Sequence, residues 1–484
     1  MSAIAALVVA AALAGCGGTT YFAGRTLPPS GLTNRVLIAI QNPSAVSHGD
    51  LQFVDAYYDT RSGYNGKPAT FTISGFSGAL PITIQNMPEE QSAYVYGSGD
   101  GSFSAINYAT EGTSTTPVPS LTGLSSSVFG TRNQNYVFAA SQASHVLTVG
   151  DRTTGASYPL ALPGVYRVSV NPGGSVALAF AQNSNYAYYP RKLTTAQGLA
   201  YSGGPTTWPK AAVDCEPQTA PIYCLFQAQS PDSVDSTGNY YGAPLVFDRP
   251  VKAVFSTDGG TAYVLSCGPE CGGSKASITP LPVGPMIFLI GQQSGTLPTN
   301  STLSSSTIPI PGGASNALVD SSTLYVVGQQ QMPDGYFGGH LTVVNLLSNK
   351  ASAPIAISDG APGAVSRMLL ADDNTLWIGM SQCTNGERAH NPGVYTSGYG
   401  CLTMVNVAAP ASPAVTMIEP YIGDATGIAA VTGLHKIYTA EGGQVYIHST
   451  VDGTSIDNQY VTVTGTAYDV AYMDATSDSD NTVY

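Results

Sequence analysis

The stretch KAVFSTDGGTAYVLSCGPECGG, residues 252–273, decides the fold of this chain. Two short runs rich in Val, Ala, Tyr and Leu lie on either side of an Asp-Gly-Gly turn at 258–260. Glycine adopts positive φ without a Cβ penalty, and an aspartate side chain hydrogen-bonds to its own turn. The stretch therefore predicts a β-hairpin, followed by a loop that contains Cys267 and Cys271.

The same pattern recurs along the chain. An apolar strand, a polar turn and a second apolar strand occupy 167–182, 252–267, 316–329, 367–382 and 427–442, and more loosely 82–99 and 126–141. A third strand usually follows, as in HLTVVNLLSNK (340–350), and some copies continue into a fourth, more variable one. The anchors of the second strands are Tyr94, Tyr136, Leu178, Tyr263, Tyr325, Trp377 and Tyr438. A unit of about 42 residues with insertions fits a four-stranded propeller blade, and the 85-residue gap after Leu178 leaves room for a degenerate copy.

The order of strand, Asp-Gly turn, Tyr-Val strand and third strand resembles the YVTN-type and lactonase-like β-propellers of bacterial cell-surface proteins. The resemblance covers residues 35–484 and implies an all-β fold: one propeller of seven or eight four-stranded blades. Strand-like sequences lie at both ends, RVLIAIQNP (35–43) and DVAYMDATSDSDNTVY (469–484). We therefore expect the ring to close by pairing of the N- and C-terminal strands, which removes exposed sheet edges.

The N-terminus predicts export. Residues 1–15 form an apolar run that is too short for a comfortable membrane span and is typical of a signal peptide, although it lacks Lys and Arg. Its end, Leu-Ala-Gly-Cys, resembles the lipobox of bacterial lipoproteins, in which Cys16 is lipidated. An ordinary signal peptide or a short anchor helix is the alternative. Residues 16–34 then form the lipidated cysteine and a flexible tether, and we expect the protein at the outer membrane or cell surface.

The bulk charge argues against one class of partner. The chain has 17 Lys and Arg against 30 Asp and Glu, which gives a net charge of −13. No basic stripe interrupts this excess, so binding to nucleic acid is not expected. The predicted partners are a protein or glycan ligand, and the membrane only through the lipid anchor, with the protein itself a monomer.

Six cysteines remain after Cys16, and they form three local pairs. In an oxidising compartment we expect these to be disulfides. The spacings do not match zinc sites and histidines are scarce nearby, so no metal is predicted. The pairs are Cys215 with Cys224, Cys267 with Cys271, and Cys383 with Cys401.

Two segments offer candidate ligand-binding residues. A Pro-rich insertion at 193–250 carries aromatic side chains with polar tips, which suit glycan or protein recognition and equally suit packing. The loop 383–401 carries a small charge cluster. The candidates are Tyr201, Trp208, Tyr240 and Tyr241 in the insertion, and Glu387, Arg388 and His390 in the loop.

An acidic cluster near the C-terminus makes calcium the one candidate cofactor. Asp474, Asp478 and Asp480 are close in sequence, but they lack the glycine and the distal glutamate of an EF-hand loop, and a solvated connection is the simpler interpretation. No G-x-S-x-G elbow and no Walker loop is present, so no catalytic residue can be assigned.

We therefore predict a binding or scaffold protein that uses its long rim loops, rather than an enzyme. A lactonase-like hydrolase with a metal in the central channel is one alternative. A periplasmic redox or assembly component is another. The propeller resemblance matches no ligand position of the lactonase-like enzymes, so it specifies the fold and not the function.

Overall fold

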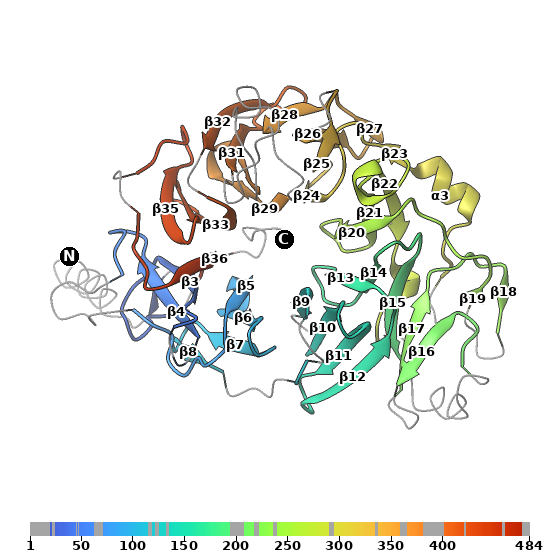
Figure 1. Ribbon diagram of the computed structural model, residues 1–484, viewed down its shortest axis with the longest axis horizontal. Helices are drawn as coiled ribbons and strands as arrows, with labels where there is room; N and C mark the ends of the chain where they lie inside the picture. Colours follow the sequence, from blue (N-terminus) through green and yellow to red (C-terminus); the bar gives the residue numbers. More distant parts are fainter. Residues whose placement is uncertain are drawn as a thin grey trace, which may run out of the picture.

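Eight antiparallel sheets surround a central axis in the computed structural model (Figure 1). Each sheet is one blade, and its first strand is the innermost. The structure describes residues 20–21, 25–44, 46, 48–61, 71–114, 119–121, 125–131, 135–193, 208–216, 222–235, 240–289, 295–333, 337–358, 365–380, 401–420, 423–456 and 460–476. All statements of number or absence below refer to these residues.

In the first four blades, the strands are ordered from the innermost to the outermost. Blade 1 contains β36 (Thr466–Tyr472), β3 (Arg35–Gln41) and β4 (Gly49–Asp55). Blade 2 contains β5 (Pro81–Met87), β6 (Ser92–Gly97), β7 (Phe103–Asn107) and β8 (Gly112–Thr113). Blade 3 contains β9 (Ser127–Gly130), β10 (Tyr136–Ser141), β11 (Val146–Asp151) and β12 (Ala156–Ala161). Blade 4 contains β13 (Val165–Val170), β14 (Ala177–Ala181), β15 (Ala187–Lys192), β17 (Tyr223–Gln227) and β16 (Ala212–Glu216).

The other four blades complete the ring. Blade 5 contains β20 (Pro250–Phe255), β21 (Thr261–Ser266), β22 (Ser277–Pro282) and β23 (Ile308–Pro309). Blade 6 contains β24 (Asn316–Asp320), β25 (Thr323–Gln331), β26 (Phe337–Asn345), β27 (Lys350–Ala351) and β28 (Ile355–Ser358). Blade 7 contains β29 (Val365–Ala371), β30 (Thr375–Met380), β31 (Cys401–Asn406) and β32 (Ala414–Pro420). Blade 8 contains β33 (Ala425–Val431), β34 (Lys436–Glu441) and β35 (Gln444–Ser449).

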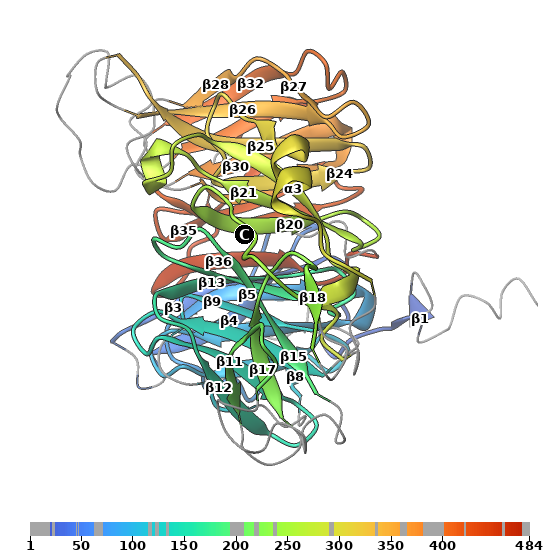
Figure 2. The same cartoon turned by 90° about the vertical axis from the view of Figure 1, so that its right-hand side faces the viewer.

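Few elements lie outside the blades. Figure 2 shows β1 projecting away from the ring. Within the described ranges, no helix is both long enough and apolar enough to cross a membrane. The additional elements are β1 (Thr20–Tyr21), β2 (Arg25–Thr26), β18 (Ser233–Val234), β19 (Tyr240–Tyr241), the helix α3 (Asn300–Ser306) and the 3₁₀ turns Pro88–Glu90, Pro269–Cys271, Gly284–Met286 and Asp372–Asn374.

The hydrophobic core is divided among the blade interfaces. The described residues form eight buried apolar clusters, and each one joins two neighbouring blades. In β3, Val36 and Ile38 face blade 8 whereas Leu37 and Ala39 face blade 2, because successive side chains of a strand point to opposite faces. Each blade therefore buries its two apolar faces against its two neighbours.

The ring closes through strands from opposite ends of the chain. β36 pairs antiparallel with β3, with Tyr472 opposite Val36 and Asp469 opposite Ala39. The predicted closure is confirmed, and the number of blades is eight. The blades hold three to five strands rather than a uniform four.

The 85-residue gap after Leu178 does not hide a blade. The described part of the insertion supplies β17 and β16, which extend the sheet of blade 4, and the small β18–β19 hairpin. The expectation of a degenerate copy was therefore wrong, because the extra chain lengthens one blade outward. The anchor in blade 3 is also Phe138 and not Tyr136, since Phe138 occupies the third position of its second strand.

Hydrogen-bonded turns connect the strands within the blades. In the opening stretch, Asp258 Oδ1 accepts from the backbone N of Gly260 at 3.0 Å, and Gly259 has a φ of 70°, so the predicted hairpin is confirmed. At the end of the third strand, five blades place an Asp or Asn whose side chain accepts from the backbone N–H two residues later. These residues are Asp55, Asn107, Asp151, Asn345 and Asn406.

Candidate functional site

One register position repeats on all eight innermost strands. In each blade it pairs with the same position of the second strand, which is the fifth residue of that strand or, in the shorter β14, the fourth. We call these eight residues the channel ring. In blade order they are Asp469, Thr83, Ser127, Arg167, Lys252, Asn316, Arg367 and Gly427.

Most of the inner strands have an irregular backbone at the level of the channel ring, and this irregularity changes the direction of their side chains. In six of the eight strands the pairing register shifts beside the ring position. A β-bulge bends its strand and redirects the next side chains. Seven of the eight ring residues are polar or charged, although they lie on strands that are otherwise largely apolar.

Lys252 is the most buried cation of the channel ring. It is 6% exposed, and its Nζ donates to Asn316 Oδ1 of the next blade at 2.7 Å. Burial, together with the positive charges of Arg167 and Arg367, holds the pKa of Lys252 well below its ordinary value. Three cationic side chains from blades 4, 5 and 7 thus influence one another electrostatically.

Arg367 is directed toward the only carboxylate of the ring. Its NH2 lies 3.6 Å from Asp469 Oδ2, although blade 8 stands between their two blades. Blade 8 contributes Gly427, where a Cβ would come within 2.7 Å of the Asp469 Cα. The absence of a side chain at 427 therefore allows the inner strands of blades 8 and 1 to approach each other closely.

Asp469 joins two blades. Its Oδ2 accepts from the backbone N of Ile84 on blade 2 at 2.8 Å, and its side chain is 1% exposed. Burial raises the pKa of Asp469 to about 6, although Arg367 and the backbone donors act in the opposite direction. Asp469 therefore orients the Arg367 side chain and connects blade 1 to blade 2.

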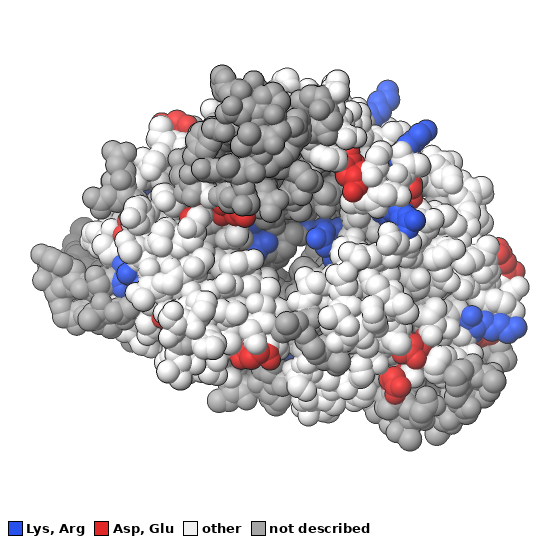
Figure 3. All heavy atoms as spheres, in the orientation of Figure 1, with Lys and Arg blue, Asp and Glu red and all other residues white. Residues whose placement is uncertain are grey.

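Arg167 has no carboxylate partner in the part of the chain that the structure describes. Its guanidinium lies 5.8 Å from the ring centroid of Tyr166, and burial lowers its pKa. Figure 3 shows a hollow at the centre of the ring, with Lys or Arg atoms on its wall. The centre of an acidic protein is thus locally cationic.

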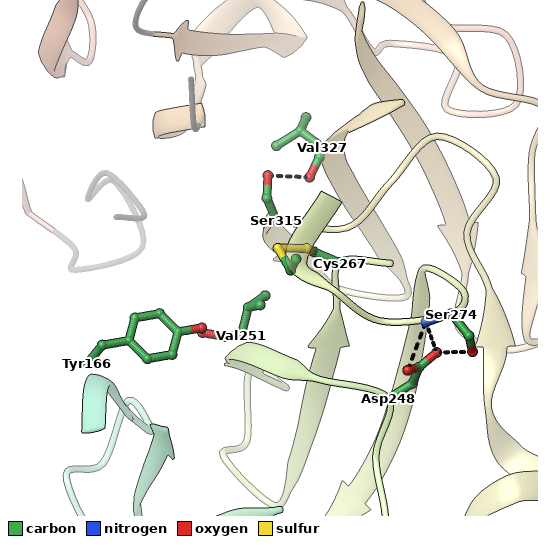
Figure 4. The surroundings of a disulfide bond; sticks show 8 residues. Tyr166, Asp248, Val251, Cys267, Ser274, Ser315 and Val327 are labelled. Carbon is green, nitrogen blue, oxygen red and sulfur yellow. Dashed lines mark hydrogen bonds between the residues drawn. A yellow bond between two sulfur atoms is a disulfide. The ribbon is translucent and has the colours of Figure 1, made fainter. Parts of the chain in front are cut away.

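A second polar layer adjoins the channel ring. The Tyr166 hydroxyl donates to the Val251 carbonyl of blade 5 at 3.2 Å, and Ser315 Oγ donates to the Val327 carbonyl at 3.3 Å (Figure 4). These contacts tie inner strands to one another and to their own blades. The hydroxyl groups of Tyr166 and Ser315 are thus used in structural hydrogen bonds, and the side chains of the channel ring are the candidate ligand-binding groups.

A separate groove lies between blades 5 and 6. Its volume is about 700 Å³, and its wall is largely apolar and proline-rich, with Pro269, Ile308 and Pro311 among its residues. It borders the disulfide between Cys267 and Cys271, which Figure 4 shows. Its charged lining residues among those described are Glu270 and Lys275 alone, whereas the channel ring brings polar or charged residues from seven blades to one level, so the groove is a weaker candidate than the channel.

Local cysteine pairs form disulfides. Cys215 is bonded to Cys224 across β16 and β17, and Cys267 to Cys271 within one turn. Cys401 also takes part in a disulfide, while Cys383 lies outside the described residues. The opening stretch is therefore a blade hairpin followed by a disulfide-closed loop.

The aromatic candidates of the insertion lie on the outer side of blade 4. Trp208 and Tyr241 are partly buried against the cluster between blades 4 and 5, and Lys210 Nζ stands 4.9 Å from the Tyr241 ring centroid. Tyr240 lies in β19, opposite Val234. The structure does not bring these residues to the channel. The remaining candidates, Tyr201, Glu387, Arg388, His390 and Cys16, lie outside the described residues.

The calcium candidate Asp474 is engaged elsewhere. It is 1% exposed, and its carboxylate accepts from Arg35 Nε at 3.0 Å and from Arg35 NH2 at 2.7 Å. Asp478 and Asp480 lie outside the described residues. The ion pair with the buried Arg35 accounts for the position of the Asp474 carboxylate without a bound calcium ion.

Asp372, Asp373 and His435 form another cluster, between blades 7 and 8. Asp373 Oδ2 lies 2.7 Å from His435 Nδ1 and accepts from Thr450 Oγ1 at 2.7 Å. Hydrogen bonding and charge raise the pKa of His435 and lower that of Asp373. One oxygen or nitrogen atom from each of the three side chains lies within 4.8 Å of the others, an arrangement that would suit a metal ion. The hydrogen bonds already account for this proximity, because they connect blade 7 to blade 8.

Sequence reasoning missed the channel ring, although a signal was present. Five of the repeated segments begin at a ring residue: 167–182, 252–267, 316–329, 367–382 and 427–442. A polar residue, or glycine, therefore opens each repeat. The signal was hidden because its meaning depends on register across blades and not on any local motif.

Comparisons with known proteins show the fold of the chain and do not show its function. No family model and no curated protein matches the chain. Among solved structures, the chain is similar to the dihydro-heme d1 dehydrogenase NirN, with 9% identity, a TM-score of 0.50, and coverage of 92% of this chain and 76% of that one. A putative 6-phosphogluconolactonase from Bacteroides fragilis has 8% identity, a TM-score of 0.47, and coverage of 91% and 98%. The periplasmic gluconolactonase of Pseudomonas aeruginosa has 12% identity, a TM-score of 0.38, and coverage of 91% and 98%.

Proposed function

We propose that the protein is an exported, lipid-anchored binding propeller that takes a small ligand into its central channel. The observation that supports this proposal is the channel ring, in which seven polar or charged side chains come to one level from seven blades. Convergent polar groups in a hollow are the usual form of a small-molecule site. The rim aromatics that favoured a glycan or protein ligand provide less support, because Trp208 and Tyr241 pack against the blade core.

The channel can be tested by blocking it. Thr83 is half-buried in the channel ring, so Thr83→Trp should fill part of the hollow. Ser305→Trp, on the exposed side of α3, is the matched control. After a thermal-shift screen of neutral sugars, amino acids, carboxylates and phosphates, each hit is measured by calorimetry. We expect Thr83→Trp to weaken binding at least about tenfold, which corresponds to about 1.4 kcal/mol, and Ser305→Trp to leave it unchanged.

Two outcomes would redirect the proposal. If Trp208→Ala abolishes binding and Thr83→Trp does not, the ligand binds at the rim and the channel proposal is wrong. Sugar lactones are added to the screen, and if one of them is hydrolysed by the wild type and not by Asp469→Asn, the hydrolase alternative replaces the binding proposal. Asp469, with a pKa of about 6 beside Arg367, is the observation that keeps that alternative in the screen.

Membrane anchoring is tested separately. Lipidation requires the thiol of Cys16, so Cys16→Ala should move the exported protein from the membrane fraction to the soluble fraction. Cys215→Ala, which removes a thiol from a disulfide far along the chain, controls for the loss of a cysteine. Membrane association that survives Cys16→Ala would refute the lipid anchor and leave the channel proposal intact.

A further inference from the structure

We propose that the channel binds a small oxyanion between Arg167, Lys252 and Arg367, and that Lys252 takes up a proton when the anion binds. The inference rests on the proposed function, because it names the ligand class of the same channel. Carboxylates and phosphates share the chemistry concerned: several oxygen acceptors and a net negative charge.

The distribution of charge in the channel ring favours an anionic ligand. Only 17 of 484 residues are Lys or Arg, yet three of the eight ring positions carry one. The ring holds a single carboxylate, Asp469, which lies beside Arg367. Arg167 has no carboxylate partner among the described residues, and Lys252 Nζ donates to the neutral Asn316. Cations that are removed from water without a counter-ion are costly unless an anion joins them.

The chemistry of the side chains also favours an oxyanion. A guanidinium presents a planar set of donors that fits two oxygens of a carboxylate or phosphate. Thr83 and Asn316 add a hydroxyl and an amide group at the same level of the channel, whereas the Ser127 hydroxyl is hydrogen-bonded to the backbone of Val168 on blade 4. A partly dehydrated channel strengthens these interactions relative to a solvent-exposed surface. The ring thus matches a compact anion better than a neutral sugar.

The proton uptake follows from the groups that surround Lys252. Arg167 and the Tyr166 hydroxyl approach from β13, Asn316 from β24, and Arg367 from β29. Burial and the two arginines disfavour the charged amine, so its pKa is low in the empty channel. An anion offsets the repulsion and favours the charged form. Binding should therefore raise the pKa of Lys252, and affinity should fall as pH rises.

The experiment is calorimetric titration of the full chain with citrate and with inorganic phosphate, in two buffers of different ionisation enthalpy. We expect binding of at least one of them with proton uptake. Arg167→Gln and Arg367→Gln should each weaken it about 10- to 100-fold, since each removes charge-assisted hydrogen bonds. Lys252→Arg should still bind, without proton uptake. Lys275→Gln removes an exposed lysine outside the channel ring and should change nothing.

Each failure has a distinct meaning. If neither anion binds to the wild type, the inference is wrong. It is also wrong if Arg167→Gln binds as tightly as the wild type. If Arg367→Gln does not fold, the inference is tested by the affinity of Arg367→Lys for the anion and by the proton uptake of the wild type. A neutral sugar whose binding is blocked by Thr83→Trp would overturn the anion site and preserve the proposed function.

Discussion

Replacement of Arg35 by Met should lower the free energy of unfolding by about 3–5 kcal/mol, because it leaves two carboxylates buried without their cation. The Arg35 side chain is 2% exposed and contacts Asp474 Oδ1 at 2.7 Å and Glu111 Oε1 at 2.8 Å. It also donates to the Tyr108 carbonyl at 2.8 Å. Asp474 follows β36, so one arginine connects the closing strand, β3 and blade 2.

The measurement is denaturant unfolding followed by circular dichroism. Lys350→Met is the control, because Lys350 is exposed at the edge of blade 6 and its loss should change stability by less than about 0.5 kcal/mol. Arg35→Met combined with Glu111→Gln and Asp474→Asn should recover part of the loss, since no buried charge then lacks a partner. A single Arg35→Met variant as stable as the control would mean that the closure does not depend on this network.

The fold could be predicted because its signal is local and repeated. An apolar strand, an Asp-Gly turn and a second apolar strand recur within short windows, as at 252–267. Each copy has two apolar faces, and only stacking buries both, which the eight interface clusters show. The length of the insertion after Leu178 could not be interpreted, because added strands and an added blade occupy similar lengths of chain.

The candidate site could not be predicted because it has no local signature. Arg167 and Arg367 are 200 positions apart in the chain, and only the register of their strands brings them to one level. Aromatic residues such as Trp208 stood out by composition instead, although packing against blade 4 explains them. Asp474 stood out as an acidic residue near the C-terminus, and its partner Arg35 lies 439 positions away.

Trp377→Ala should also cost about 3–5 kcal/mol, the range for a fully buried large aromatic side chain. Trp377 is 0% exposed and belongs to the cluster between blades 7 and 8. Its Nε1 donates to Thr375 Oγ1 at 2.9 Å, and its ring centroid lies 6.0 Å from that of His448. The truncation therefore leaves a cavity and removes the donor to the buried Thr375 hydroxyl, which keeps its own hydrogen bond to the Asp372 carbonyl.

The matched control is Tyr263→Ala. Tyr263 occupies the same third position of its second strand, in blade 5, and it also faces the next blade, but it is only partly buried. If stability depends on how completely each blade interface is filled, Tyr263→Ala should cost clearly less than Trp377→Ala under the same denaturant titration. Equal losses would show that the strand position itself, and not burial at the interface, sets the stability of the ring. Trp377→Phe should recover most of the loss, since it restores most of the apolar volume between blades 7 and 8.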